Sequence, residues 1–294
     1  MSKANIKELL DAGVHFGHLK RKWNPNMAPY IFAEKKGIHV IDLHKTAAKL
    51  DETAAALKQV AKSGKKILFV ATKKQAKDIV AEMAKEVNMP YVTERWSGGM
   101  LTNFATIRKA IRKMTSIDKM ESDGTFSNLS KRERLQISRQ RAKLEKNLGS
   151  IADLTRIPAA IFVVDILKEH IAIAEAKKLG IKTFAMVDTN SDPRQVDYAI
   201  PANDDASKSI AAVMRVVVDS VKEGLNERNA EKASKKEETA KPKEAAAPEK
   251  KEPVAEQAKE TPAAEKKTEA PAKEEAPVKE EKVAEKEEAS KTEK

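Results

Sequence analysis

The stretch HFGHLKRKWN at residues 15–24 gathers side chains that could serve three kinds of chemistry. His15 and His18 could share a face and bind a metal ion, but Gly17 between them predicts a loop, and no Cys, Asp or Glu offers a third ligand at a normal spacing. The stretch also lacks a nucleophile for a histidine to activate. RNA binding would use every polar group, with cations on phosphates and rings on bases or sugars. The RNA contacts predicted in this loop are His15, His18, Lys20, Arg21, Lys22, Trp23 and Asn24.

A second candidate is ERWSGGMLTNF at residues 94–104, where two glycines precede a helical segment. Free N–H groups in such a turn could face an anion. The spacing matches neither of the common glycine-rich nucleotide motifs, so a nucleotide cofactor is disfavoured. Close approach of the turn to an RNA backbone is the favoured interpretation, with Arg95, Trp96 and Asn103 as contacts. A tight turn that only aims the next segment is the alternative.

Five aspartates lie at or just after the ends of predicted strands, where ligands bind in doubly wound sheets. They are Asp165, Asp188, Asp192, Asp204 and Asp205. They allow a second hypothesis, a Mg²⁺-dependent phosphohydrolase. The same residues are also good turn and N-cap formers, and neither a nucleophile nor a phosphate loop accompanies them. We therefore expect no enzymatic activity and no cofactor, and keep the hydrolase as the alternative.

The segments that must position these residues alternate between the hydrophobic patterns of strands and those of helices. Short apolar runs predict buried strands at 66–72, 159–165, 182–188 and 197–201. Helices are predicted at 42–63, from a Thr72–Gln75 capping box to Val87, at 169–180 and at 204–224. For the last of these, Asp205 is the expected N-cap and Gly224 the expected stop. Strands alternating with helices indicate a parallel sheet covered by helices on both faces.

Residues 104–148 break this alternation and contain no strand pattern. Ile107, Ile111 and Met114 share one helical face, and a capping box at Ser130 and Glu133 opens a second helix. Narrow apolar stripes of this kind indicate a coiled-coil-like helical hairpin. Residues 105–148 hold 12 Lys+Arg against 5 Asp+Glu, so the hairpin would suit a polyphosphate. Its predicted RNA contacts are Arg108, Arg112, Lys113, Arg132, Arg134 and Arg139.

The rest of the composition narrows the class. The chain has a net charge of +11, yet residues 227–294 hold 19 acids and 17 bases, so residues 1–226 carry the positive charge. Residues 227–294 contain six prolines and no Gly, Leu, Ile or aromatic residue, which predicts a disordered tail that tethers a partner or only adds solubility. The absence of cysteine fits the cytoplasm. No apolar run approaches the length of a membrane helix, and the first residues lack a signal-peptide core.

Taken in order, the motifs resemble those of the bacterial small-subunit ribosomal protein two family. They are AGVHFGHLKRKWNPNMAPYIF, KILFVATKKQA, RWSGGMLTNFATIR, DGTF, LSKRE, NLGSIADLTRIPAAIFVVD, EHIAIAEAKKLGI, VDTNSDP and IPANDDA. The resemblance covers about residues 5–225, although Gly149-Ser150 replaces the paired glycines usual in the family at that turn.

The resemblance implies a flavodoxin-like three-layer α/β/α domain made of 1–103 and 149–226, with 104–148 as an inserted basic hairpin. It also implies a structural, non-enzymatic role in the small ribosomal subunit in the cytoplasm, with no membrane contact. The implied partners are the 16S small-subunit rRNA and neighbouring small-subunit proteins, including the mRNA-binding ribosomal protein one. The loop at His15–Asn24, the turn at Arg95–Asn103 and the hairpin would form the RNA surface.

Overall fold

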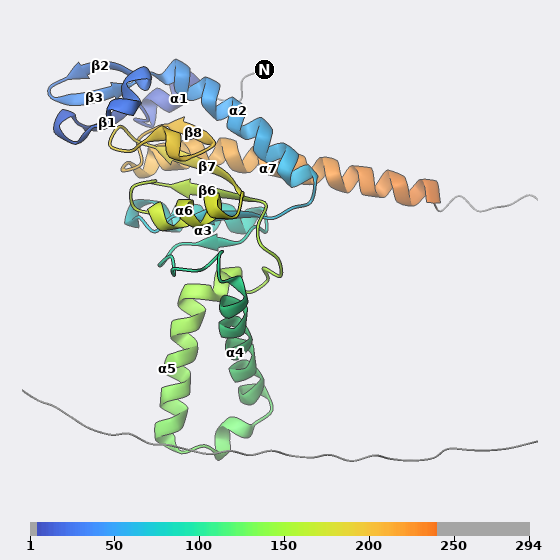
Figure 1. Ribbon diagram of the computed structural model, residues 1–294. Helices are drawn as coiled ribbons and strands as arrows, with labels where there is room; N and C mark the ends of the chain where they lie inside the picture. Colours follow the sequence, from blue (N-terminus) through green and yellow to red (C-terminus); the bar gives the residue numbers. More distant parts are fainter. Residues whose placement is uncertain (1–4, 240–294) are drawn as a thin grey trace, which may run out of the picture. The chain divides into compact units, whose positions relative to one another are not determined.

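The computed structural model describes residues 5–239, and its centre is a five-stranded parallel sheet (Figure 1). The strands are β4 (Ile67–Val70), β5 (Tyr91–Val92), β6 (Ala160–Val164), β7 (Lys182–Val187) and β8 (Tyr198–Pro201). Their spatial order is β5-β4-β6-β7-β8. In order of sequence this is 2-1-3-4-5, the flavodoxin-like arrangement, so the fold prediction is confirmed. All residues of β4 and β6 are buried, as their continuous apolar runs predict.

Helices cover both faces of this sheet. One face packs against α1 (Ile6–Asp11), α2 (Leu43–Lys62), α3 (Lys74–Glu86) and α7 (Ser207–Thr239) through a core that includes Phe69, Phe162 and Phe184. The other face packs against α6 (His170–Lys178), the base of the hairpin and Met27. The three layers follow from the period-two pattern of the strands, because alternate side chains enter opposite cores.

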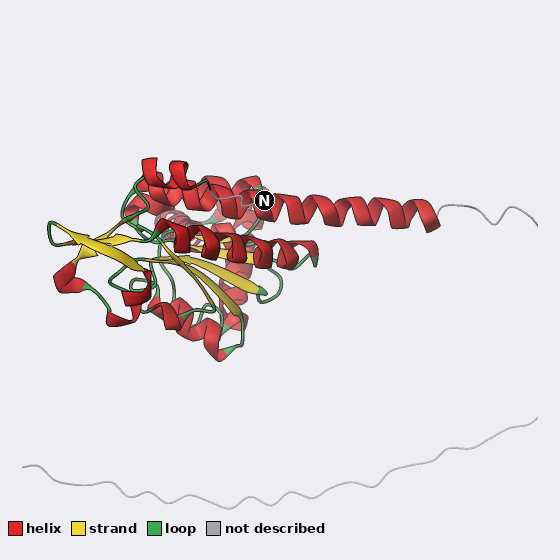
Figure 2. Ribbon diagram, turned by 90° about the horizontal axis from the view of Figure 1, so that it is seen from above, coloured by secondary structure: helices red, strands yellow, loops and turns green. Residues whose placement is uncertain are grey.

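A small antiparallel sheet precedes this domain and was not predicted. It contains β1 (Phe16–Leu19), β2 (Ile31–Lys35) and β3 (Ile38–Ile41) in the order β1-β3-β2, and Figure 2 shows it at one end of the domain. The expected loop around Gly17 is therefore wrong, because this glycine lies inside β1. A Cβ on Gly17 would lie 2.6 Å from Thr189 Cγ2 and 3.1 Å from the His39 carbonyl oxygen, so the strand requires glycine for its close approach.

The inserted hairpin is present as predicted. Its helices, α4 (Phe104–Ser122) and α5 (Lys131–Leu148), run side by side away from the sheet (Figure 1). The capping box is confirmed, since the Ser130 hydroxyl accepts the Glu133 N–H and the Glu133 carboxylate accepts the Ser130 N–H. Ile111, Met114 and Leu148 are buried along the seam. Five short 3₁₀ turns connect the described elements, η1 (Lys20–Lys22), η2 (Pro25–Tyr30), η3 (Thr125–Asn128), η4 (Gly149–Ile151) and η5 (Pro193–Gln195).

Two predicted helix starts are wrong. Helix α3 has Lys73 as its N-cap with no side-chain cap bond, and the Thr72 hydroxyl instead donates to the Glu169 carboxylate. Helix α7 begins at Ser207, because the Asp205 carboxylate is bound by Lys73 and His18. In both cases a tertiary partner takes the group that the local motif would use.

The predicted end of the last helix is also wrong. Helix α7 passes through Gly224 and continues to Thr239, so residues 227–239, which the sequence assigned to the tail, are helical (Figure 2). Gly224 serves close packing, since a Cβ there would collide with the Lys58 carbonyl oxygen on α2. Lys58 and Lys62 extend this contact by pairing with Glu227 and Glu231. The remainder of the predicted tail, 240–294, lies outside the described residues.

In the described part of the chain, no helix combines the length and apolar character that crossing a membrane requires.

Candidate nucleic-acid interface

The hairpin carries cations that its own acids do not neutralise. Arg112, Lys113, Arg132 and Arg139 are exposed and Arg134 is half-buried. Within residues 5–239 none of these five forms an ion pair, whereas Arg141 pairs with Asp118 and Glu145 and Lys146 pairs with Glu94. The free cations lie on both helices, so the hairpin can present positive charge along its length to a polyanion.

Arg108 differs from the other predicted hairpin contacts. Its Nη1 donates to the Leu154 carbonyl oxygen at 3.0 Å, and the side chain is half-buried. The bond ties the first turns of α4 to the segment that leads into β6. Arg108 therefore holds the base of the hairpin, which the sequence could not indicate because the two residues are 46 positions apart.

The turn at residues 95–103 binds an anion, but the anion belongs to the chain itself. Glu175 Oε2 accepts the N–H groups of Leu101 and Thr102 at 2.9 and 3.0 Å, and Glu175 Oε1 accepts that of Gly99 at 2.7 Å. Trp96 Nε1 donates to the same carboxylate at 3.2 Å. Burial of Glu175 is outweighed by these N–H groups, so its pKa is lowered. These N–H groups are not free for an external anion, because Glu175 occupies them, and the approach of the turn to an RNA backbone stays a prediction.

This arrangement separates the three predicted contacts of the turn. Trp96 is 7% exposed and packs in the core, so its ring has a structural role here, and its contact with RNA stays a prediction. Asn103 is exposed and its Oδ1 accepts the Thr106 hydroxyl at 2.7 Å. Arg95 is exposed, and no ion pair involves it within the described residues. Arg95 and Asn103 thus stay available at the surface while Trp96 anchors the turn.

The stretch at residues 15–24 also divides into exposed and structural residues. Arg21 and Lys22 are exposed, and Lys20 is exposed but pairs with Glu34 at 2.7 Å. Trp23 is 37% exposed and its ring lies 5.2 Å from that of His39. Asn24 is structural, since its Oδ1 accepts the Asn26 N–H and its own N–H donates to Thr189 O.

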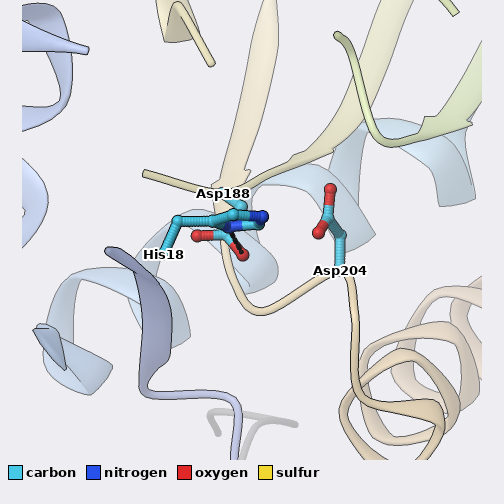
Figure 3. Close-up of side chains that lie close together, drawn as sticks. All are labelled: His18, Asp188 and Asp204. Carbon is cyan, nitrogen blue, oxygen red and sulfur yellow. Dashed lines mark ion pairs between the residues drawn. The ribbon is translucent and has the colours of Figure 1, made fainter. Parts of the chain in front are cut away.

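His15 and His18 do not form a common site. His15 packs against Phe16 with ring centroids 4.0 Å apart, and burial lowers its pKa. His18 Nδ1 lies 2.9 Å from Asp188 Oδ2 (Figure 3). Its Nε2 lies 3.3 Å from Asp205 Oδ2. The hydrogen bond to Asp188 raises the His18 pKa. His18 is therefore held between carboxylates and fastens β1 to the loops after β7 and β8.

The strand-end aspartates surround a lysine that the sequence analysis missed. Lys73 Nζ lies 2.7 Å from Asp204 Oδ1, 2.6 Å from Asp205 Oδ1 and 3.6 Å from Asp165 Oδ2. Burial and the neighbouring Asp188 and Asp165 raise the pKa of Asp204. Burial alone would lower the pKa of Lys73, but the carboxylates of Asp204, Asp205 and Asp165 outweigh it, and the pKa of Lys73 is raised. Asp192 lies apart from them and caps η5 through the Arg194 N–H.

One trio in this cluster has the donor set of a divalent metal site. His18, Asp188 and Asp204 each offer a ligand atom, and these atoms lie within 4.8 Å of one another (Figure 3). Within residues 5–239, Asp204 Oδ2 has no hydrogen-bond partner. One histidine with two carboxylates fits a cation of the zinc or manganese type, and the site differs from the predicted His15–His18 pair. Lys73 pairs with Asp204 and Asp205, and His18 pairs with Asp188, so these carboxylates already have cationic partners within the chain.

The comparisons with known proteins agree over most of the chain. The family model described as ribosomal protein S2 matches residues 9–224. The chain is 71% identical over 232 residues to the small ribosomal subunit protein uS2 of Phocaeicola vulgatus, covering 79% of this chain and 83% of that protein. It is 71% identical over 231 residues to the protein of the same name from Flavobacterium johnsoniae, covering 79% and 91%. The protein of that name from Bacteroides fragilis is 69% identical over 232 residues, covering 79% and 84%.

Proposed function

Because the chain belongs to the ribosomal protein S2 family, we propose that it is a structural component of the small ribosomal subunit in the bacterial cytoplasm and binds the 16S small-subunit rRNA. The observation that carries the rRNA contact is the hairpin, on which the exposed Arg112, Lys113, Arg132 and Arg139 form no ion pair within the described residues. The family is one of ribosomal proteins and not of enzymes, and it does not support the phosphohydrolase alternative.

The rRNA surface of this proposal is narrower than the sequence suggested. It keeps Arg112, Lys113, Arg132, Arg134 and Arg139 on the hairpin. It also keeps Arg95 and Asn103 near the base of the hairpin, and Arg21 and Lys22 in η1 after β1. Trp96, Asn24 and Arg108 position these contacts and His18 braces the small sheet. Arg and Lys on the outer faces of two helices suit phosphate and shape readout of a duplex, since the base edges of A-form RNA lie in a deep groove.

A neighbouring protein would contact the small antiparallel sheet. Phe32 is 77% exposed, and Phe16 and Leu19 are half exposed, all on β1 and β2. Exposed apolar side chains on the two edge strands of one short sheet favour a protein partner over water. We assign this surface to a small-subunit neighbour, with the mRNA-binding ribosomal protein one as the candidate, and Phe32→Ser in purified subunits should lower its occupancy.

A charge-reversal experiment tests the rRNA contact. The triple substitution Arg112→Glu, Lys113→Glu and Arg139→Glu leaves Arg108 and the buried seam intact. A matched control reverses Lys74, Lys208 and Arg215, which are exposed cations on α3 and α7. The hairpin variant should lose on the order of tenfold or more in affinity for the rRNA transcript at moderate salt, relative to the control. Equal affinity of the two variants would refute the hairpin contact.

A further inference from the structure

The amino-terminal edge of the central sheet carries a continuous groove that no proposed contact uses. Four hollows of about 360, 680, 570 and 440 Å³ lie there. The hollows of 360 and 680 Å³ share Lys66 and Asp153. Those of 680 and 570 Å³ share Lys65 and Ile157. Those of 570 and 440 Å³ share Lys182 and Tyr198. We call their combined lining the edge groove. It starts at Ser150, beside the base of the hairpin, and crosses the sheet to β8.

The topology explains why the groove is continuous. The residues directly before the five strands all line it, namely Lys66, Pro90, Ala159, Ile181 and Asp197. Parallel strands begin at one edge, so these positions form a row in the order of the sheet. With about 4.8 Å between neighbouring strands, the row from β5 to β8 is about 19 Å long.

The charge of the edge groove is strongly positive. Six cations line it, Lys65, Lys66, Lys85, Arg156, Lys177 and Lys182, against only Asp153 and Asp197. The Asp197 carboxylate is already bonded to the Thr183 N–H and hydroxyl. In residues 5–239 none of the six cations forms an ion pair, although Lys58 and Lys62 on the adjacent α2 do. The groove therefore has the charge of a surface for an anionic polymer.

Helix dipoles explain only part of this charge. Lys85 and Lys177 lie in the last turns of α3 and α6, where cations stabilise the helix end. Lys65, Arg156 and Lys182 lie outside any helix, in loops or at the start of β7, and are exposed. Ile157 and Leu179, 46% and 40% exposed, provide an apolar wall beside them. Cations along an apolar wall suit a sugar–phosphate backbone, which carries one negative charge per nucleotide.

We propose that the edge groove is a second rRNA-binding surface, continuous with the hairpin, and that Lys65, Arg156 and Lys182 contact phosphates there. This inference rests on the proposed function, because it adds a surface to the same partner. At the carboxyl edge of the sheet, where ligands of such folds usually bind, Lys73 is held by ion pairs to Asp204 and Asp205. The groove at the opposite edge is open.

The test measures binding of the full-length chain to the 16S rRNA transcript as a function of salt. The variant Lys65→Glu, Arg156→Glu, Lys182→Glu is compared with the control reversed at Lys74, Lys208 and Arg215. Affinity decreases with salt, so the plot of log affinity against log salt has a negative slope. If all three groove cations contact phosphates, this slope should become less steep by roughly 2–3 in the groove variant, and the control should keep the wild-type slope. Identical slopes for the groove variant and the control would overturn the groove, and far-UV circular dichroism verifies that both fold.

Photo-crosslinking in assembled subunits separates the possible outcomes. Ile157 in the groove and Leu135 on the hairpin are each replaced by p-benzoylphenylalanine in the full chain. Crosslinks from both positions to rRNA support the inference. A crosslink of Leu135 to rRNA, with Ile157 joined to a protein or to nothing, overturns the groove and leaves the proposed function standing. Absence of rRNA crosslinks from both positions, together with a chain that does not bind the transcript, overturns both.

Discussion

Glu175 Oε2 accepts the backbone N–H of Leu101 at 2.9 Å, across 74 residues of sequence. The same carboxylate accepts two further N–H groups and the Trp96 indole, so a single side chain on α6 fixes the turn from which the hairpin departs. The turn looks like an anion-binding loop in the sequence because it is one. Its ligand is internal, and its role is to set the direction of a cationic arm.

Removing this carboxylate should destabilise the base of the hairpin. Glu175→Ala leaves three backbone N–H groups and the indole N–H without their acceptor, which should lower the free energy of unfolding by about 3 kcal/mol or more. Urea denaturation followed by tryptophan fluorescence measures the loss, and hydrogen exchange of the Gly99 and Leu101 amides locates it. Glu175→Gln is the matched control, because it keeps the volume and one oxygen acceptor and should cost less. Equal stability of wild type and Glu175→Ala would contradict the assignment.

Glu175 should also make the free energy of unfolding depend on pH in the acid range. The folded pKa of Glu175 lies below its ordinary value of 4.5, so its stabilisation is complete above pH 4.5 and is lost as the pH falls through the folded value. The stability difference between wild type and Glu175→Gln should therefore shrink below pH 4.5. A difference that stays constant from pH 7 to pH 3 would show that the charge is not what the turn binds.

Gly17 should resist substitution although it lies in a strand. Gly17→Ala puts a Cβ against Thr189 and should cost about 1–3 kcal/mol through overpacking. Gly98→Ala is the control, since its Cβ would meet nothing within 4 Å. Thr189→Ser in the Gly17→Ala background removes the closest methyl and should recover part of the loss in a denaturation curve. If both alanine variants unfold alike, the close approach of β1 to the Thr189 loop is not tight.

Gly224 gives a test in which helix propensity and packing predict opposite signs. Glycine to alanine in a helix interior normally stabilises by about 1 kcal/mol. Gly224→Ala should destabilise instead, because the new Cβ would collide with the Lys58 carbonyl oxygen and separate α2 from α7. Gly149→Ala, with an ordinary 3.5 Å contact to Glu145 Cγ, should be neutral or stabilising. Thermal unfolding of the two variants decides, and a stabilised Gly224→Ala would show that the helices are not in contact there.

These residues also explain how far the sequence could reach. The four apolar strands and the Ser130 capping box are local signals, and the structure confirms them. Glu175 was visible only as an acid within an apolar helix, and Lys73 only as one of two lysines after a strand. Their roles depend on partners more than 70 residues away, as does the burial of Trp96.

The β1–β3 sheet and the length of α7 were missed for related reasons. Strands β1, β2 and β3 have only four or five residues and alternate weakly, and a glycine in β1 looked like a break. Gly224 looked like a helix stop because its requirement comes from the surface of α2, not from its own helix. The predicted RNA surface divided in the same way. The exposed hairpin cations remain candidates, whereas Trp96, Arg108 and His18 have structural partners.

Sedimentation of the tagged full-length chain in a cell lysate tests whether the chain is a component of the small ribosomal subunit that depends on its hairpin cations. We predict that the wild-type chain sediments with the small ribosomal subunit at magnesium concentrations that separate the two ribosomal subunits. For the variant with Arg112, Lys113 and Arg139 reversed, the fraction of the chain at the top of the gradient should rise several-fold. For the variant with Lys74, Lys208 and Arg215 reversed, this fraction should stay as in the wild type. A wild-type chain that remains at the top of the gradient, free of small subunits, would contradict the account.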